Sequence, residues 1–154
     1  MSFNRFALVA AQSLLPVGAS LDIFELDGIP VYNQDLDKQP GAHPRGGPIL
    51  FATPEYNYSV PGALKNAIDW ASRPYGDSAW QGKPVAVMSA SVGILAARAR
   101  STICASPSCS SPEVLIANAA QRFNERGELN DEVTREQIRK LLAELAAWTR
   151  KLKG

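Results

Sequence analysis

A polar and aromatic stretch, residues 53–59, holds the side chains best suited to binding a ligand. It reads Thr-Pro-Glu-Tyr-Asn-Tyr-Ser and follows an apolar run. Asn57 can both donate and accept hydrogen bonds, and Tyr56 and Tyr58 offer aromatic faces. Pro54 stiffens the stretch, so its backbone N–H and C=O groups can be held ready for the polar edge of a flat heterocycle. The residues alone leave open an alternative, an ordinary strand-to-helix turn in which Ser59 caps the helix.

The elements that must position this stretch follow from hydrophobic patterning. Four short apolar runs predict buried strands, and several lack strict alternation, which is typical of a parallel sheet covered on both faces. Helical periodicity predicts three helices, of which the first covers residues 4–15. The second follows Ser59, has Pro61 in its first turn and extends to Ala71. The third is capped by Asp131 and extends past Leu152. The predicted strands are Leu21–Leu26, Ile49–Thr53, Val85–Ser89 and Val114–Ala117.

This order of elements predicts a single α/β domain over residues 1–154. In an open α/β sheet, ligands bind beyond the carboxyl ends of the strands, which is where residues 53–59 should lie.

The formal net charge is +1, which gives no electrostatic support to a nucleic-acid or membrane-surface partner. No apolar run approaches the roughly 18 residues that span a bilayer, and the first residues do not resemble a signal peptide, so we expect a cytoplasmic protein. The lone His43 and the two cysteines, Cys104 and Cys109, predict no metal site.

The residue string around the loop resembles a known family signature. Thr53-Pro54-Glu55-Tyr56-Asn57, then Pro61-Gly62 and the run from Leu64 to Trp70, closely resemble the NADPH-dependent FMN reductase family, which includes bacterial quinone and chromate reductases. Ser2-Phe3-Asn4-Arg5 is similar to the end of that family's phosphate loop, and the segment 83–93 to a strand and loop that flank the flavin. The resemblance implies a flavodoxin-like three-layer sandwich with a parallel sheet.

The resemblance also implies a function. Bound FMN would take hydride from NADPH or NADH and pass electrons to a small molecule such as a flavin, a quinone or chromate. The flavin carries this chemistry, so no catalytic side chain is predicted. Relatives of this kind pair their subunits, so a homodimer or homotetramer is expected. The residues implied to bind FMN are Pro54, Glu55, Tyr56, Asn57 and Tyr58 at the ring, Ser91 and Gly93 beside it, and Ser2, Asn4 and Arg5 at the phosphate. For Arg5, a solvated helix position is the alternative.

The sequence departs from the family in three ways, and these departures support an alternative to this function. The family has an apolar strand and a complete phosphate loop before the position of Ser2, and neither is present here, so we expect a sheet without its first strand. Residues 38–48 are too rich in Pro and Gly for a crossover helix. The run 100–111 has no helical periodicity, although plausible codons read one base earlier give an amphipathic sequence. The alternative is therefore a non-catalytic, truncated or frameshifted relic that binds flavin weakly or not at all.

A nicotinamide-binding Rossmann domain is a third interpretation. Such a domain needs a Gly-x-Gly-x-x-Gly turn between a strand and a helix, with an acidic residue further along the chain. No strand predicted here is followed by that pattern. The sequence therefore disfavours it.

Overall fold

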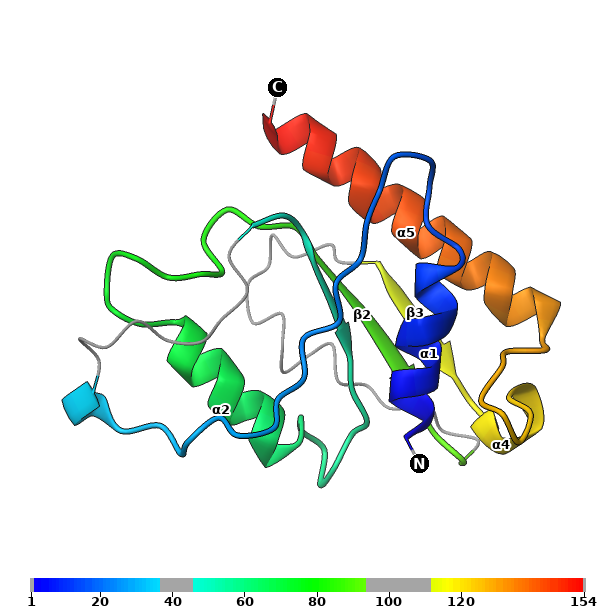
Figure 1. Ribbon diagram of the computed structural model, residues 1–154, viewed down its shortest axis with the longest axis horizontal. Coiled ribbons are helices and arrows are strands. Elements are labelled where there is room, and N and C mark those ends of the chain that lie inside the picture. Colours follow the sequence, from blue (N-terminus) through cyan, green and yellow to red (C-terminus); the bar gives the residue numbers. More distant parts are fainter. Residues whose placement is uncertain (1, 37–45, 94–111, 154) are drawn as a thin grey trace.

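A computed structural model describes residues 2–36, 46–93 and 112–153 (Figure 1). His43, both cysteines and the run 100–111 lie outside the described residues, as does most of the Pro- and Gly-rich segment 38–48. None of the helices in the described ranges has the length and apolar character that crossing a membrane requires.

A parallel sheet of three strands forms the centre of the described chain. β1 (Ile49–Ala52) pairs with β2 (Val85–Ala90), and β2 pairs with β3 (Glu113–Ile116), in the order β1-β2-β3. β2 is almost wholly buried, in keeping with its unbroken run of apolar and small residues. Three of the four predicted strands are thus confirmed to within about one residue at each end.

The fourth predicted strand, Leu21–Leu26, is wrong. The segment has no strand structure, and of its backbone groups only the Leu21 carbonyl has a hydrogen bond within the described chain, from Gln12 Nε2 at 2.9 Å. A strand exists only through pairing, and no neighbouring strand is present in the described residues on this side of β1. The apolar side chains of the segment are nevertheless used, since Leu21 and Leu26 pack against two different core clusters.

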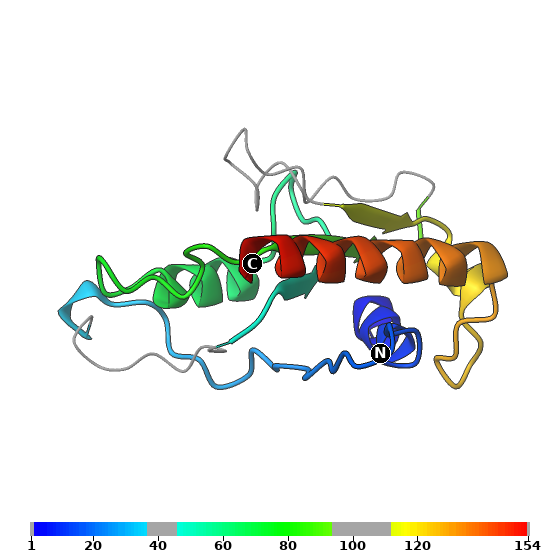
Figure 2. The same ribbon diagram turned by 90° about the horizontal axis from the view of Figure 1, so that it is seen from above.

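Helices cover both faces of the sheet. α1 (Phe3–Gln12) and α5 (Glu132–Lys153) share one core with Leu50 of β1 and Met88 of β2. α2 (Gly62–Ala71) packs on Phe51, whose side chain points to the opposite face because neighbouring strand residues alternate. Figures 1 and 2 show this arrangement from two directions. Two short elements complete the described chain, the 3-10 turn η1 (Gln34–Leu36) and α4 (Ala119–Arg122).

The start of α2 differs from the prediction. Pro61 is the N-cap residue and provides no side-chain cap, and the helix begins at Gly62 rather than with Pro61 in its first turn. Ser59 does not cap the helix, because it pairs with Tyr56 across a tight turn. The local preference of Ser for helix caps is overridden by this pairing.

The start of α5 matches the prediction that Asp131 caps it. The Asp131 carboxylate accepts hydrogen bonds from the Thr134 hydroxyl and from the Thr134 N–H, the latter at 2.8 Å, and pairs with Arg122 at 2.5 Å. The hydrogen bond from the Thr134 hydroxyl is the largest cause that lowers the pKa of Asp131 below its ordinary value of 3.8, followed by the Thr134 N–H. A carboxylate at a helix N-terminus also complements the helix dipole.

We expect Asp131→Ala to lower the free energy of unfolding by about 1 kcal/mol, the usual value of an N-cap. Asp131→Asn, which keeps the cap but not the charge, should cost less. Because folding lowers the pKa of Asp131, its charge stabilises the protein above the pKa of the unfolded chain, and this stabilisation is lost as the pH falls through the folded pKa. Urea unfolding should therefore show a difference between wild type and Asp131→Asn at pH 7 that shrinks below about pH 4. A difference that stays constant with pH would contradict this role of the charge.

Candidate functional site

The N-terminus of α1 is fastened to the carboxyl end of β2 by one buried side chain. Asn4 Nδ2 donates to the Ala90 carbonyl at 3.1 Å, and Asn4 Oδ1 accepts from the Ala90 N–H at 2.9 Å. Asn4 is only 7% exposed. Its amide therefore holds Ser2 and the first turn of α1 at the carboxyl edge of the sheet.

The loop after β1 makes a tight turn in which Tyr56, Asn57 and Tyr58 are exposed. Tyr56 and Ser59 exchange two backbone hydrogen bonds, at 2.9 and 3.0 Å. Between them Asn57 and Tyr58 have φ values of 51° and 62°, as a two-residue type I′ turn requires. A positive φ is uncommon for Tyr, and such conformations cluster at ligand sites. Tyr58 is 94% exposed, so its ring is available to a ligand.

A second turn follows β2 at the same edge. The Ser91 N–H donates to the Ile116 carbonyl at 2.9 Å, the Gly93 N–H donates to Ser91 Oγ at 3.1 Å, and the Asn118 N–H donates to the Gly93 carbonyl at 3.1 Å. The turn that contains Ser91 and Gly93 is therefore held between the ends of β2 and β3. Both candidate turns thus follow the carboxyl ends of neighbouring parallel strands.

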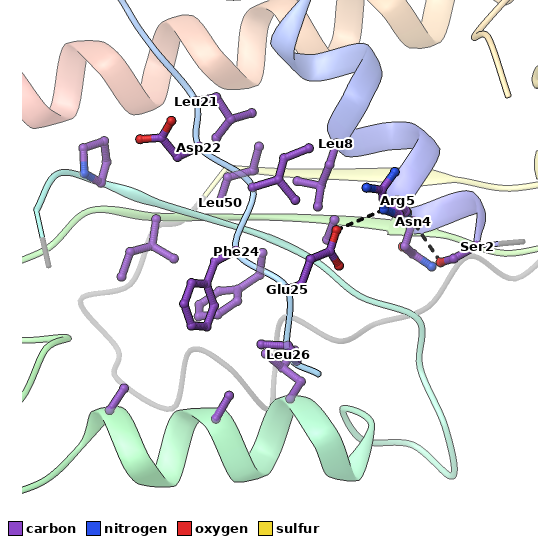
Figure 3. Close-up of a pocket in the computed structure, with 18 of the residues that line it drawn as sticks. Ser2, Asn4, Arg5, Leu8, Leu21, Asp22, Phe24, Glu25, Leu26 and Leu50 are labelled. Atoms are coloured by element: carbon purple, nitrogen blue, oxygen red, sulfur yellow. Dashed lines mark hydrogen bonds and ion pairs between the residues drawn. The ribbon is translucent and has the colours of Figure 1, made fainter. Parts of the chain in front are cut away.

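A groove of about 360 Å³ lies along β1 between α1, α2 and the segment 21–26, within the usual size range of small-molecule sites. Four predicted site residues meet in it: Ser2, Asn4, Arg5 and Pro54. Figure 3 shows Leu8 and Arg5 from α1, Leu50 from β1, and Leu21 and Phe24 from the facing segment around it. The other predicted site residues do not line this groove: Glu55, Tyr56, Asn57, Tyr58, Ser91 and Gly93.

The charge in this groove was not foreseen from the sequence. Arg5 Nε pairs with Glu25 Oε1 at 3.0 Å, and both side chains are more than half exposed. Asp22 is a further acidic lining residue. In the sequence, Glu25 stands out only as an acidic residue within an apolar run. That signal does not indicate that Arg5 is its partner. Any anion that binds Arg5 must therefore compete with Glu25.

The donor set at this end of the groove fits the phosphate of FMN. Ser2 caps α1, and its hydroxyl accepts the Arg5 N–H at 3.4 Å. The N–H groups of Phe3 and Asn4 are left without a hydrogen-bond partner among the described residues, as expected for the first turn of a helix. Free N–H groups, the positive end of the helix dipole and a guanidinium are the kinds of group that bind anions. The amide of Asn4 itself is occupied by Ala90, so it holds the site in place rather than offering a free donor.

Fold and groove together define an α/β protein with a candidate ligand site at the carboxyl edge of a parallel sheet. The family model "NADPH-dependent FMN reductase" matches residues 48–103. A quinone reductase of Pseudomonas putida is 38% identical, over 97% of this chain and 88% of the relative. The NAD(P)H-dependent FMN reductase PA1204 of Pseudomonas aeruginosa is 42% identical, over 99% and 91%. The solved structure of FerB, a flavoenzyme NAD(P)H:(acceptor) oxidoreductase from Paracoccus denitrificans, matches with a TM-score of 0.72 and 29% identity, over 97% of this chain and 91% of FerB.

The chain belongs to the NADPH-dependent FMN reductase family. The predicted flavodoxin-like fold is confirmed by the likeness to FerB and by the parallel sheet between helices. Membership makes the protein an oxidoreductase with FMN as its cofactor and NAD(P)H as its reductant, as the sequence predicted.

Proposed function

We propose that the chain binds FMN at the carboxyl ends of β1 and β2 and transfers electrons from NAD(P)H to a quinone. The observation that supports this most directly is the meeting of Ser2, Arg5 and Pro54 in one groove at the N-terminus of α1. FMN, when bound, accepts hydride from the nicotinamide and returns the electrons to an acceptor. The protein's own contribution is to bind and orient the cofactor.

In this proposal each part of the site has a separate task. The first turn of α1, with Ser2 and Arg5, holds the phosphate. The backbone from Pro54 to Tyr58 holds the edge of the flavin ring, with Glu55, Tyr56 and Asn57 around it, and Ser91 and Gly93 approach the ring from the turn after β2. Asn4 holds the two halves of the site together through its two hydrogen bonds to Ala90.

A quinone is the favoured acceptor because several of the curated relatives are named for it. Besides the Pseudomonas putida protein, a Burkholderia relative 37% identical over 97% of this chain is a 2-hydroxy-1,4-benzoquinone reductase. Chromate and free flavin are secondary candidates from the family resemblance. A homodimer or homotetramer and a cytoplasmic location, where NAD(P)H is supplied, belong to the same proposal.

The phosphate site can be tested by changing charge on either side of the Arg5–Glu25 pair. Arg5→Gln removes the guanidinium and should weaken FMN binding by about tenfold or more, as expected for a charged hydrogen bond. Glu25→Gln frees Arg5 from its partner and should strengthen binding by about two- to fivefold, which corresponds to an exposed ion pair. The measurement is a titration that follows quenching of FMN fluorescence.

Asp22→Asn is the matched control, because it removes the same charge from the same groove without touching the Arg5 pair. Equal effects of Asp22→Asn and Glu25→Gln on FMN affinity would mean that the loss of any negative charge in the groove strengthens binding. That outcome would contradict a specific role of the Arg5–Glu25 pair. Unchanged affinity in Arg5→Gln would remove Arg5 from the site and restore its interpretation as a solvated helix residue.

NADPH oxidation by the FMN-loaded protein, with and without added benzoquinone, tests the acceptor.

A further inference from the structure

The segment that follows β3 holds the turn after β2 through backbone hydrogen bonds. The Asn118 N–H donates to the Gly93 carbonyl at 3.1 Å. The Ala119 N–H donates to the Ser91 carbonyl at 2.9 Å. Figure 1 shows α4, which follows β3, at the same edge of the sheet as the N-terminus of α1. The position of the turn after β2 therefore depends on how residues 117–119 are oriented.

Arg122 binds the opposite end of one of these peptide groups. Arg122 Nε donates to the Ala117 carbonyl at 2.8 Å, and this carbonyl belongs to the same peptide unit as the Asn118 N–H. One peptide group is thus fixed at both ends, by Arg122 at its oxygen and by Gly93 at its hydrogen. Because a peptide group is planar, the two hydrogen bonds together set its orientation.

The orientation that these bonds select is strained at Asn118. Asn118 has φ 50° and ψ 44°, the left-handed region that residues other than Gly seldom occupy. Turning the Ala117–Asn118 peptide over would bring φ to a negative value, but it would break both hydrogen bonds. Strain of this kind persists only where the surroundings hold it in place. The bond from Arg122 therefore stabilises the orientation in which the Asn118 N–H faces Gly93.

Arg122 is itself fixed from α5. Its Nη1 pairs with the Asp131 carboxylate at 2.5 Å and donates to Thr134 Oγ1 at 3.0 Å. A planar guanidinium with donors in fixed positions can bridge a carbonyl and a carboxylate at once, whereas the ammonium of lysine is a single point charge. The residue type at position 122 therefore matters beyond its charge.

We propose that Arg122 is a positioning residue of the flavin site. Through the Ala117–Asn118 peptide it holds the Ser91–Gly93 turn in the orientation that binds the flavin ring. This inference rests on the proposed function, which brings that turn to the ring. Arg122 does not line the groove, so its effect on FMN passes through the backbone that it holds.

Amide hydrogen exchange of the flavin-free protein, followed by NMR, tests whether Arg122 holds the turn. In Arg122→Gln the Asn118 and Ala119 amides should exchange at least about tenfold faster than in the unmodified chain, because local opening no longer breaks the bond from Arg122. Unchanged exchange at both amides would overturn the proposal. If Arg122→Gln does not fold, Arg122→Lys takes its place in this comparison.

Arg135→Gln is the matched control. The Arg135 side chain has the same exposure as that of Arg122, 32%. It also bonds a carboxylate and a backbone carbonyl, those of Glu132 at 3.3 Å and Leu129 at 3.4 Å. Loss of the Arg135 guanidinium should leave the exchange of Asn118 unchanged. Equal acceleration in the two arginine variants would overturn the proposal, because it would show a general loosening of the chain.

Titration with FMN separates positioning from stability. Arg122→Lys keeps a positive charge beside Asp131 but cannot also bond the Ala117 carbonyl as a guanidinium does. It should therefore keep most of the stability and still bind FMN at least about threefold more weakly, whereas Arg135→Gln should bind FMN as the unmodified chain does. Equal FMN affinity of Arg122→Lys and the unmodified chain would overturn the proposal. An unmodified chain that binds no FMN would overturn the proposed function, and hydrogen exchange would still decide whether Arg122 holds the turn.

Discussion

Replacing Asn4 with alanine is expected to lower the free energy of unfolding by about 2–4 kcal/mol. The change leaves the Ala90 N–H and carbonyl without their partner in a buried position, and each unsatisfied buried group costs about 1–3 kcal/mol. It should also weaken FMN binding, because the first turn of α1 loses its attachment to β2. Urea unfolding and FMN titration measure the two effects.

Gln12→Ala is the matched control for this prediction. Gln12 lies on the same helix and its amide also bonds a backbone carbonyl, that of Leu21 at 2.9 Å, but the bond is exposed. Its loss should therefore cost under about 1 kcal/mol and leave FMN affinity unchanged. An Asn4→Ala protein as stable as Gln12→Ala would show that the buried amide does not hold the site together.

Gly127→Ala is expected to destabilise the protein by about 2–5 kcal/mol. Gly127 has φ +81°, where a side chain is strained, and an added Cβ would lie 2.5 Å from Phe6 Cδ1. The ring cannot simply move aside, because Phe6 packs against Phe3 and Phe123 at centroid distances of 6.0 and 5.9 Å. The expected cost combines about 1–2 kcal/mol for the backbone with about 1–3 kcal/mol for overpacking.

Gly18→Ala separates these two contributions. Gly18 has nearly the same φ, +82°, but no atom of the described residues lies within 4 Å of its added Cβ. Thermal or urea unfolding should therefore show only the backbone cost for Gly18→Ala and a clearly larger loss for Gly127→Ala. Equal losses would mean that the Phe6 ring does not restrict this position.

The sequence predicted the elements whose formation depends on local or periodic signals. The apolar runs at 49–53, 85–89 and 114–117 became the three strands, because each has a neighbour to pair with. Asp131 was predicted as the cap of α5 because capping uses residues within one turn of each other. The loop after β1 was predicted as a candidate ligand site from residue types and the family resemblance together.

The failures share a physical cause, dependence on partners distant in sequence. The apolar run 21–26 has strand composition, but composition cannot supply the neighbouring strand that pairing requires. The two hydrogen bonds between Asn4 and Ala90 join residues 86 positions apart. The Arg5–Glu25 ion pair depends on how the segment 21–26 lies across the groove. The positive φ values of Asn57 and Tyr58 follow from the pairing of Tyr56 with Ser59, which overrode the expected helix cap.

The most direct test of the central claim is the visible spectrum of the purified protein after incubation with FMN and removal of free flavin by gel filtration. We expect flavin absorbance that co-elutes with the folded protein and bleaches when NADPH is added without oxygen. Addition of a benzoquinone should then restore the absorbance. A folded but colourless protein would contradict the account and favour a relic that has lost its cofactor.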